Sequence, residues 1–464
     1  MIETLLAARR SLGGAPPGLA SQGASRERFV ERADITSWGR VNRCPQRWAR
    51  PQFRDELGVL IHDAAWPEKL AIGLRRSYGD SCLNRLGAVI DATGLDRFIA
   101  FDPHTGRLLA ESGTSLSQAL RLVVPHGWFL PTTPGTRFVT LGGAVANDVH
   151  GKNHHRSGAF GANVLSLGLQ RSDGRRLTLT EREEPDLFRA TIGGLGLTGV
   201  IECVELQLAP IRSAFLNVEI LPFENLEKFW DIAGESVASH EHTVAWVDCT
   251  TRRGRGVFNR ANWAEFGDLV AYDNRSFRSV PFDFPSFALN GLSVGAFNEL
   301  YYRLHRLKQS RQTQCYGTYF YPLDSVHNWN RLYGARGMLQ YQCVVPPDEE
   351  RTALPALLHE IARSGQASFL AVLKTFGDKP SPGLLSFPRP GTTLALDFPH
   401  RGEATLALMG RLDAIVREAN GALYPAKDGR MPADMFRRSF PQWEAFARWK
   451  DPAMNSDFWR RVSQ

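Results

Sequence analysis

The stretch from residue 131 to residue 163 constrains the fold of this chain more than any other part. It reads PTTPGTRFVTLGGAVANDVHGKNHHRSGAFGAN and holds six glycines, two prolines, three histidines, one lysine and two arginines. We therefore expect neither a plain helix nor a plain core strand, but a long irregular segment of the kind that is usually functional or disordered. Phe138 and Phe160 argue against disorder. Gly142 and Gly143 would let a ligand approach the backbone closely.

The length and composition are those of a globular protein. The chain has 464 residues, enough for two or three domains, and 43% of them are hydrophobic. No apolar run is long enough to span a membrane, and the N-terminus lacks a secretory signal. The six cysteines are scattered singly, which predicts neither a metal site nor a disulfide framework and favours a reducing compartment.

The net charge limits the classes of ligand that the protein is expected to bind. The net charge of +7 suits a phosphate-bearing ligand, nucleic acid or an anionic membrane surface. The excess rests on scattered arginines without a basic block or a known binding motif, so we expect no nucleic-acid partner.

Hydrophobic periodicity outlines the elements. Residues 1–36 read as a leader and residues 37–60 as an aromatic and arginine-rich arm. Helices are expected at 115–125, 185–190, 353–363 and 404–419. Strands are expected at 70–72, 88–91, 98–101, 108–110, 164–170, 177–179, 242–249, 338–345, 367–376 and 393–398.

Two further loops are rich in glycine or hydroxyl donors. The strand at 70–72 runs into RRSYGD (75–80), which could cradle a phosphate or could equally be a plain strand-to-turn junction. TIGGLGLTGVI (191–201) feeds a later strand. It lacks a βαβ pattern, so a Rossmann domain is unsupported.

Taken together, these segments resemble the FAD-dependent oxidases of the vanillyl-alcohol oxidase superfamily, which carry the PCMH-type FAD-binding domain. Within it they are most similar to the flavin oxidase subunits of decaprenylphosphoryl-β-D-ribose 2′-epimerases. The resemblance runs in order from about residue 70 onward. Its motifs are RRSYGD (75–80), PGTRFVTLGGAVANDVHGKNHH (134–155), GGLGLTGVI (193–201), WNRLYGARGMLQYQ (329–342), SFLAVLKTFG (368–377), LSFPRPG (385–391), DFP (397–399) and LYPAKDGR (423–430).

The resemblance implies a two-domain α+β flavoprotein. Its FAD-binding domain, of two α+β subdomains, would span residues 37–212, after a mobile leader at 1–36. A substrate-binding domain with an antiparallel sheet would span 213–415, and residues 416–464 would return to the FAD domain.

The resemblance also implies the cofactor contacts. Tyr78 stands where flavinylated relatives carry a histidine, so FAD is expected to bind non-covalently. The implied FAD-binding residues are Arg76, Ser77, Tyr78, Gly79, Asp80, Gly113, Pro134, Gly135, Thr136, Gly142, Gly143, Ala146, Asn147, His150, Gly151, Lys152, Gly158, Asn163, Gly196, Gly199, Ile201, Tyr424 and Lys427.

The chemistry needs a base for the hydroxyl proton and cations for developing negative charge. The implied catalytic residues are Lys427, His150 and Tyr78, with the base left open between Lys427 and His150. His154 and His155 are expected to be scaffold, and no metal is expected. Ala395 stands where the mycobacterial enzymes carry a cysteine that covalent inhibitors target. The implied substrate-binding residues are Lys152, Trp246, Phe320, Gln340, Gln342, Lys374, Thr393 and Ala395.

The implied function is FAD-dependent oxidation of the 2′-hydroxyl of a polyprenylphosphoryl-β-D-ribose to the 2′-keto sugar. A separate NAD(P)H-dependent keto-reductase would complete epimerisation to the arabinose form. The alternative is an oxidase of another sugar, alditol or aldonolactone, and a flavin-fold partner subunit without catalysis is a more distant one. The expected location is cytoplasmic, with peripheral contact at the inner membrane because the substrate is a lipid phosphate.

Overall fold

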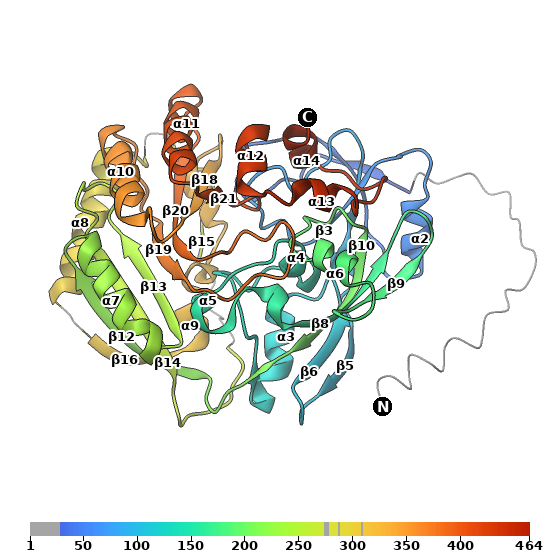
Figure 1. Ribbon diagram of the computed structural model, residues 1–464, viewed down its shortest axis with the longest axis horizontal. Coiled ribbons are helices and arrows are strands. Elements are labelled where there is room, and N and C mark those ends of the chain that lie inside the picture. Colours follow the sequence, from blue (N-terminus) through green and yellow to red (C-terminus); the bar gives the residue numbers. More distant parts are fainter. Residues whose placement is uncertain (1–27, 273–277, 286–287, 308–309) are drawn as a thin grey trace, which may run out of the picture.

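The computed structural model describes residues 28–272, 278–285, 288–307 and 310–464 (Figure 1). Most of the leader predicted at 1–36 therefore lies outside the described residues. Its last part, however, contains the fully buried Phe29 and strand β1 (Val30–Arg32). The arm predicted at 37–60 also holds regular structure, namely β2 (Gln46–Ala49) and α2 (Glu56–Ile61). The two strands are only three and four residues long and depend on pairing with other strands, β1 with β2 and β2 with β4.

The first sheet has four strands in the order β1-β2-β4-β3, with β3 at Lys69–Ile72 and β4 at Ala88–Asp91. β4 pairs in parallel with both β2 and β3, whereas β1 is antiparallel to β2. All four residues of β4 are buried, as expected for a central parallel strand.

The second sheet is antiparallel, in the order β5-β6-β10-β8-β9. Helix α3 begins with a capping box, in which Ser115 and Gln118 satisfy each other's backbone N–H groups. The bounds are β5 (Phe98–Asp102), β6 (Arg107–Glu111), β8 (Val164–Gln170), β9 (Arg176–Leu179), β10 (Val200–Gln207), α3 (Leu116–Val123), α4 (Leu141–Ala146), α5 (His154–Ser157) and α6 (Pro185–Thr191). β7 (Trp128–Phe129) and β11 (Ala209–Pro210) form a small separate pair.

The third sheet is fully antiparallel and has eight strands, in the order β16-β12-β14-β13-β19-β20-β18-β21. Helices α10 and α11 stand along its outer side in Figure 1. The bounds are β12 (Phe215–Phe223), β13 (His242–Val247), β14 (Gly256–Trp263), β16 (Ser310–Cys315), β18 (Met338–Val345), β19 (Ala371–Phe376), β20 (Gly391–Pro399), β21 (Ala422–Leu423), α7 (Leu226–Ser239), α8 (Gly291–Leu307), α9 (Tyr316–Phe320), α10 (Glu350–Arg363) and α11 (Glu403–Glu418). β15 (Arg278–Ser279) and β17 (Val326–His327) form a small parallel pair.

The period-2 alternation of this sheet divides its two faces. Leu394, Leu396 and Phe398 of β20 belong to one hydrophobic core with residues of α7, α10 and α11. Thr393, Ala395 and Asp397, which alternate with them, line a cavity on the opposite face.

The chain after α11 returns to the first half through α12 (Ala433–Ser439), α13 (Trp443–Ala447) and α14 (Asp457–Val462). The N–H of Lys69 donates to the carbonyl of Ala453 at 2.7 Å, and the hydroxyl of Ser172 donates to Asp451 at 2.6 Å. α13 and α14 consequently lie beside β3 and β10 (Figure 1). Among the described residues, no helix is both long and apolar enough to cross a bilayer.

The stretch at 131–163 is more regular than its composition suggests. Thr140 accepts a hydrogen bond from the N–H of Gly143 and caps α4, a single short helix, and α5 follows after an irregular loop. A Cβ at Gly142 would lie 2.8 Å from the Cβ of Ser112, so the helix packs tightly against the neighbouring chain. Gly142 therefore allows close packing of α4, whereas Gly135 lies in an open part of the loop.

Candidate active site

A cavity of 860 Å³ lies between loops of the first half and the open face of the eight-stranded sheet. The first half contributes loops 71–78 and 133–152, and the sheet contributes side chains of β13, β18, β19 and β20. A cavity of this size at a junction between domains is the usual form of a cofactor and substrate site.

The RRSYGD loop lines one wall and is fixed by its backbone. The N–H of Tyr78 donates to the carbonyl of Ala426 at 2.9 Å, and the guanidinium of Arg76 stacks 4.3 Å from the centre of the Trp38 ring. Burial lowers the pKa of Arg76. Arg75 adopts a φ of +54°, where glycine would be free of strain.

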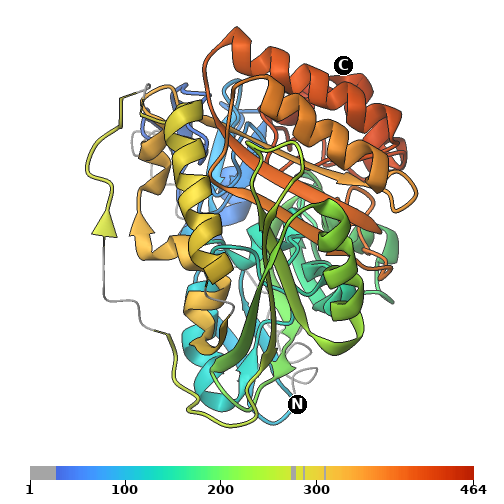
Figure 2. The same ribbon diagram turned by 90° about the vertical axis from the view of Figure 1, so that its left-hand side faces the viewer.

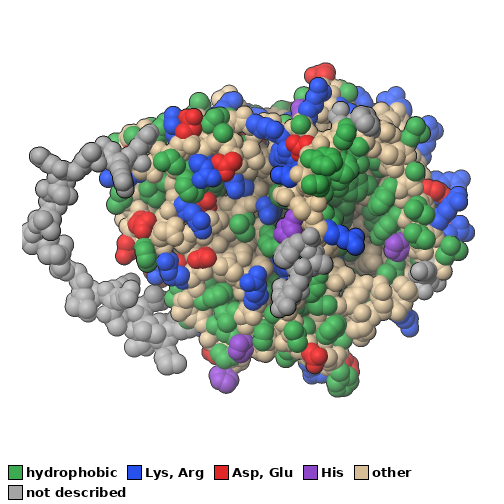
Figure 3. Space-filling view, turned by 180° about the vertical axis from the view of Figure 1, so that it is seen from behind, with side chains coloured by type: hydrophobic (Ala, Val, Ile, Leu, Met, Phe, Trp, Pro, Cys, Tyr) green, Lys and Arg blue, Asp and Glu red, His purple; other side chains and the backbone are tan. Residues whose placement is uncertain are grey.

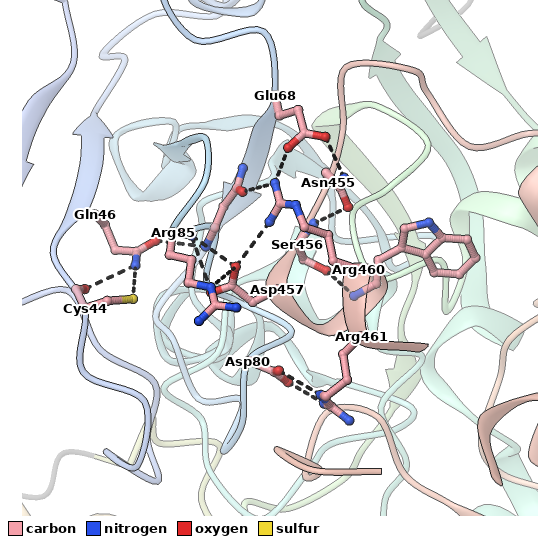
Figure 4. A network of polar contacts seen from close by, with 12 residues as sticks. Cys44, Gln46, Glu68, Asp80, Arg85, Asn455, Ser456, Asp457, Arg460 and Arg461 are labelled. Carbon is pink, nitrogen blue, oxygen red and sulfur yellow. Dashed lines mark hydrogen bonds and ion pairs between the residues drawn. The ribbon is translucent and has the colours of Figure 1, made fainter. Parts of the chain in front are cut away.

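Gly79 and Asp80 of this loop do not line the cavity. Asp80 is buried and forms an ion pair with Arg461 of α14 at 2.7 Å, as Figure 4 shows. A Cβ at Gly79 would lie 1.7 Å from the carbonyl oxygen of Asp428. Arg461 also contacts Asp428 at 3.1 Å, so one guanidinium joins the loop before Asp80 to the turn that carries Lys427.

Most of the residues predicted to bind the cofactor reach the cavity wall. Five do not: Gly79, Asp80, Gly113, Gly158 and Asn163. Gly113, for example, packs closely against the chain, since a Cβ there would lie 1.9 Å from the carbonyl oxygen of Ala92. The residues that line it are Arg76, Ser77, Tyr78, Pro134, Gly135, Thr136, Gly142, Gly143, Ala146, Asn147, His150, Gly151, Lys152, Gly196, Gly199, Ile201, Tyr424 and Lys427.

Three half-buried lysines lie on this wall. Burial lowers the pKa of Lys152 and of Lys374 to about 7. Burial also lowers the pKa of Lys427, and the carboxylate of Asp397 opposes that shift. The ammonium of Lys152 lies 4.2 Å from the Tyr319 ring centre and donates to the Tyr319 carbonyl.

His150 is held between two polar side chains. Its Nδ1 lies 2.9 Å from the Nζ of Lys374, and its Nε2 lies 2.9 Å from the side-chain amide of Gln342. Burial, followed by the charge of Lys374, lowers the pKa of His150 well below its ordinary value. The ring is therefore neutral, and both of its nitrogens already have partners.

The sheet delivers the remaining predicted side chains to one face. Gln340 pairs with Asp397 across strands, Gln342 with Ala395, and Lys374 with Thr393. Trp246 and Phe320 also line the cavity.

Asp397 is the residue on this face to which sequence reasoning assigned no role. It accepts a hydrogen bond from the amide of Gln340, and burial raises the pKa of its carboxyl. The sequence contained a pattern that could have placed Asp397 on this face. Asp397 continues the two-residue spacing of Thr393 and Ala395 and belongs to the DFP motif.

The two adjacent histidines lie outside the cavity wall. His154 is buried against Phe376, with ring centres 4.7 Å apart, and His155 bonds the carbonyl of His240 at 2.9 Å. Both contacts hold α5 against its neighbours.

Unpaired polar groups on its wall make the cavity suitable for a dinucleotide cofactor. The hydroxyls of Ser81 and Ser112 are buried, line the cavity and have no hydrogen-bond partner among the described residues. A Cβ at Gly135 would meet nothing within 4 Å. Unpaired donors beside bare backbone are suited to a polar ligand such as a pyrophosphate. Within the described part of the chain, no cluster of three or more His, Cys, Asp or Glu side chains could hold a metal ion.

Comparison with known proteins agrees with this fit. Residues 45–180 match the model of the family described as "FAD binding domain". The chain is 36% identical over 414 residues to the decaprenylphosphoryl-β-D-ribose oxidase of Mycolicibacterium smegmatis, which covers 85% of this chain and 88% of that protein. It is 32% identical over 371 residues to the "Uncharacterized protein in mprA 5'region" of Streptomyces coelicolor, covering 75% of this chain and 99% of that protein.

More distant relatives match less than half of this chain. The D-arabinono-1,4-lactone oxidase of Yarrowia lipolytica is 23% identical over 201 residues, covering 42% of this chain and 37% of that protein. Together these matches show an FAD-dependent oxidoreductase that acts on a CH–OH group and has an α+β fold. The chain belongs to the family of FAD-dependent oxidases that includes decaprenylphosphoryl-β-D-ribose oxidase.

Proposed function

We propose that this enzyme oxidises the 2′-hydroxyl of a polyprenylphosphoryl-β-D-ribose to the 2′-keto sugar. The proposal rests on the charge of the cavity wall. It is supported by the similarity to the decaprenylphosphoryl-β-D-ribose oxidase of Mycolicibacterium smegmatis. Five basic side chains line the cavity, Arg75, Arg76, Lys152, Lys374 and Lys427, against two acidic ones, Asp324 and Asp397. A wall with this excess of basic side chains favours ligands that bring phosphate groups.

The cofactor half of the site is assigned to the first half of the chain. Arg76, Ser77 and the backbone of residues 134–143 would hold FAD, with the side chain of Tyr424 fixed by a 3.0 Å hydrogen bond to the carbonyl of Asn147. When bound, the flavin supplies a hydride acceptor. Tyr78 stands where flavinylated relatives carry a histidine, which supports a cofactor held without a covalent link.

Lys427 is the base that we assign. Burial lowers its pKa, so a neutral amine is accessible, and its Nζ lies 4.0 Å from the centre of the Tyr78 ring. A lysine with a depressed pKa can accept the hydroxyl proton of the sugar. His150 is the weaker candidate, because its two ring nitrogens already bond Lys374 and Gln342.

The remaining side chains orient the substrate. Gln340 and Gln342 project from one face of β18 and can bond sugar hydroxyls, while Lys152 and Lys374 are placed to pair with its phosphate. Trp246 gives an apolar surface beside them. The product is a ketone, so its conversion to the arabinose form requires a separate NAD(P)H-dependent keto-reductase. A lipid-linked substrate requires the enzyme to work at a membrane surface.

Anaerobic reduction of the purified FAD enzyme tests this proposal. A polyprenylphosphoryl-ribose is expected to bleach the flavin absorbance within seconds, and free ribose or an aldonolactone is not. Bleaching by an aldonolactone and not by the phosphoribose would replace the proposal with its alternative, an oxidase of a free sugar, alditol or lactone.

A further inference from the structure

Helix α8 has a buried inner side and a separate stripe of exposed apolar side chains. Val294, Asn298 and Tyr302 are buried on its inner side, where Asn298 donates to Asp248 at 2.9 Å. A second stripe, which we call the outer stripe, consists of Phe297, Leu300, Leu304 and Leu307. These four side chains are 47%, 59%, 49% and 83% exposed. Spacings of three and four residues place them on one side of the helix, and α8 lies uncovered on the outside of the molecule in Figure 2.

The outer stripe is continuous with the inside of the cavity. Trp246, on the cavity wall, packs against Tyr301 of α8 with ring centres 4.7 Å apart, and Tyr301 stacks on Phe297 at 6.0 Å. Phe369 completes the path, since it contacts Phe297 at 5.9 Å and its carbonyl accepts the indole N–H of Trp246 at 3.0 Å. An apolar route of aromatic rings therefore leads from the substrate site to the surface.

Cations accompany the outer stripe. Arg303 and Arg306 are exposed on α8. Arg311, in the strand β16 that follows it in the chain, has a side chain that is 85% exposed and forms an ion pair with Glu219. The helix contains one acidic residue, Glu299, which forms ion pairs with Arg255 and Arg303. In Figure 3, hydrophobic side chains and Lys or Arg side chains stand together around a hollow in the surface.

We propose that the outer stripe of α8 docks on a bilayer that contains anionic lipids, so that the tail of a lipid substrate passes along the aromatic path into the cavity. An exposed apolar stripe flanked by arginines is the pattern of a helix that lies in a membrane interface. The choice of a bilayer, rather than a second protein, follows from the continuity with the cavity and rests on the proposed function.

Vesicle sedimentation of the FAD-loaded full chain tests the docking. Wild type is expected to bind vesicles of phosphatidylcholine and phosphatidylglycerol, and to bind pure phosphatidylcholine at least threefold more weakly. The variant Leu300→Glu/Leu304→Glu is expected to lower the partition coefficient at least tenfold. Val59→Glu/Leu86→Glu is the matched control, because these side chains are 52% and 66% exposed elsewhere and should bind as wild type.

Two results would overturn the proposal. One is equal vesicle binding by wild type and Leu300→Glu/Leu304→Glu. The other is a wild-type dimer that binds no vesicles and that this variant splits, which would assign the outer stripe to a second copy of the chain. The vesicle assay contains no substrate, so it does not depend on the proposed function. If the proposed function were wrong, polyprenylphosphoryl-ribose would fail to bleach the flavin while α8-dependent vesicle binding persisted.

Discussion

The Nζ of Lys427 lies 4.0 Å from the centre of the Tyr78 ring, which places an amine against an aromatic face on the cavity wall. The two residues come from segments nearly 350 positions apart, and a backbone hydrogen bond from Tyr78 to Ala426 fixes their distance. Neighbouring Asp397 favours the charged form of Lys427, whereas burial favours the neutral form. The balance between these two effects controls when the amine can accept a proton.

Replacing Lys427 should remove the base. We expect Lys427→Ala to lower kcat by roughly a hundred- to ten-thousandfold, the usual contribution of a positioned base. The measurement is the rate of anaerobic flavin reduction at saturating substrate. Lys228→Ala, at an exposed lysine of α7, is the control and should react at the wild-type rate. An unaltered rate in Lys427→Ala would return the role to His150.

The pH dependence of kcat should report the same amine. Lys427 must be neutral to act, so kcat should rise with pH and level off below 10.5, the ordinary lysine value, because burial lowers its pKa. Asp397 raises the pKa of Lys427, so Asp397→Asn should move the rise to lower pH by about one unit. A shift to higher pH would contradict the assignment.

Phosphate recognition should depend on the charge of Lys374. Burial lowers its pKa to about 7, so the free enzyme loses this charge as pH rises through neutrality. KM for the phosphorylated substrate should therefore increase above pH 7. Lys374→Met should raise KM by about tenfold or more and flatten this dependence, in line with loss of one charge-assisted hydrogen bond. Steady-state kinetics from pH 6 to 9 would show whether KM or kcat responds.

Arg461 should hold the RRSYGD loop in place, although it does not line the cavity itself. It joins Asp80 and Asp428, so Arg461→Gln is expected to loosen both the loop that carries Tyr78 and the turn that carries Lys427. Stability should fall by about 3 kcal/mol, as when one partner of a largely buried ion pair is removed. The readouts are the FAD dissociation constant and the pH midpoint of kcat, and Arg461→Lys should restore part of each. Arg438→Gln, exposed on α12, should alter neither.

The cavity should be inert toward inhibitors that attack a cysteine at position 395. This chain carries Ala395 there, and the nearby Cys82 on the cavity wall is buried, which raises its pKa to about 12. Intact-mass measurement after turnover with such an inhibitor should show no adduct on wild type and a single adduct on Ala395→Cys. An adduct on wild type that disappears in Cys82→Ser would prove this expectation wrong.

Periodic alternation predicted many of the strands, and the resemblance to the flavin oxidases implied most of the residues that line the cavity. The segment 338–345 becomes β18 with both glutamines on the cavity face, as its alternation indicated. Alternation predicted β13, β18, β19 and β20 of the eight-stranded sheet, whereas β12, β14, β16 and β21 were not predicted.

The differences arise where distant partners decide the outcome. Asp80 stands inside a phosphate-loop motif, yet it pairs with Arg461 and does not line the cavity, and nothing local to residue 80 could reveal a partner in α14. β1 and β2 likewise depend on strand pairing and are too short to carry a periodic signal.

The pairing of Asp80 with Arg461 also has a consequence for biosynthesis. The two residues are 381 positions apart. A ribosome that adds about 5 to 20 residues per second needs roughly 20 to 75 s to cover that separation. During that interval the nascent loop at 75–80 has no cationic partner for its carboxylate. We therefore expect flavin uptake to follow translation of α14, because only then can Arg461 pair with Asp80.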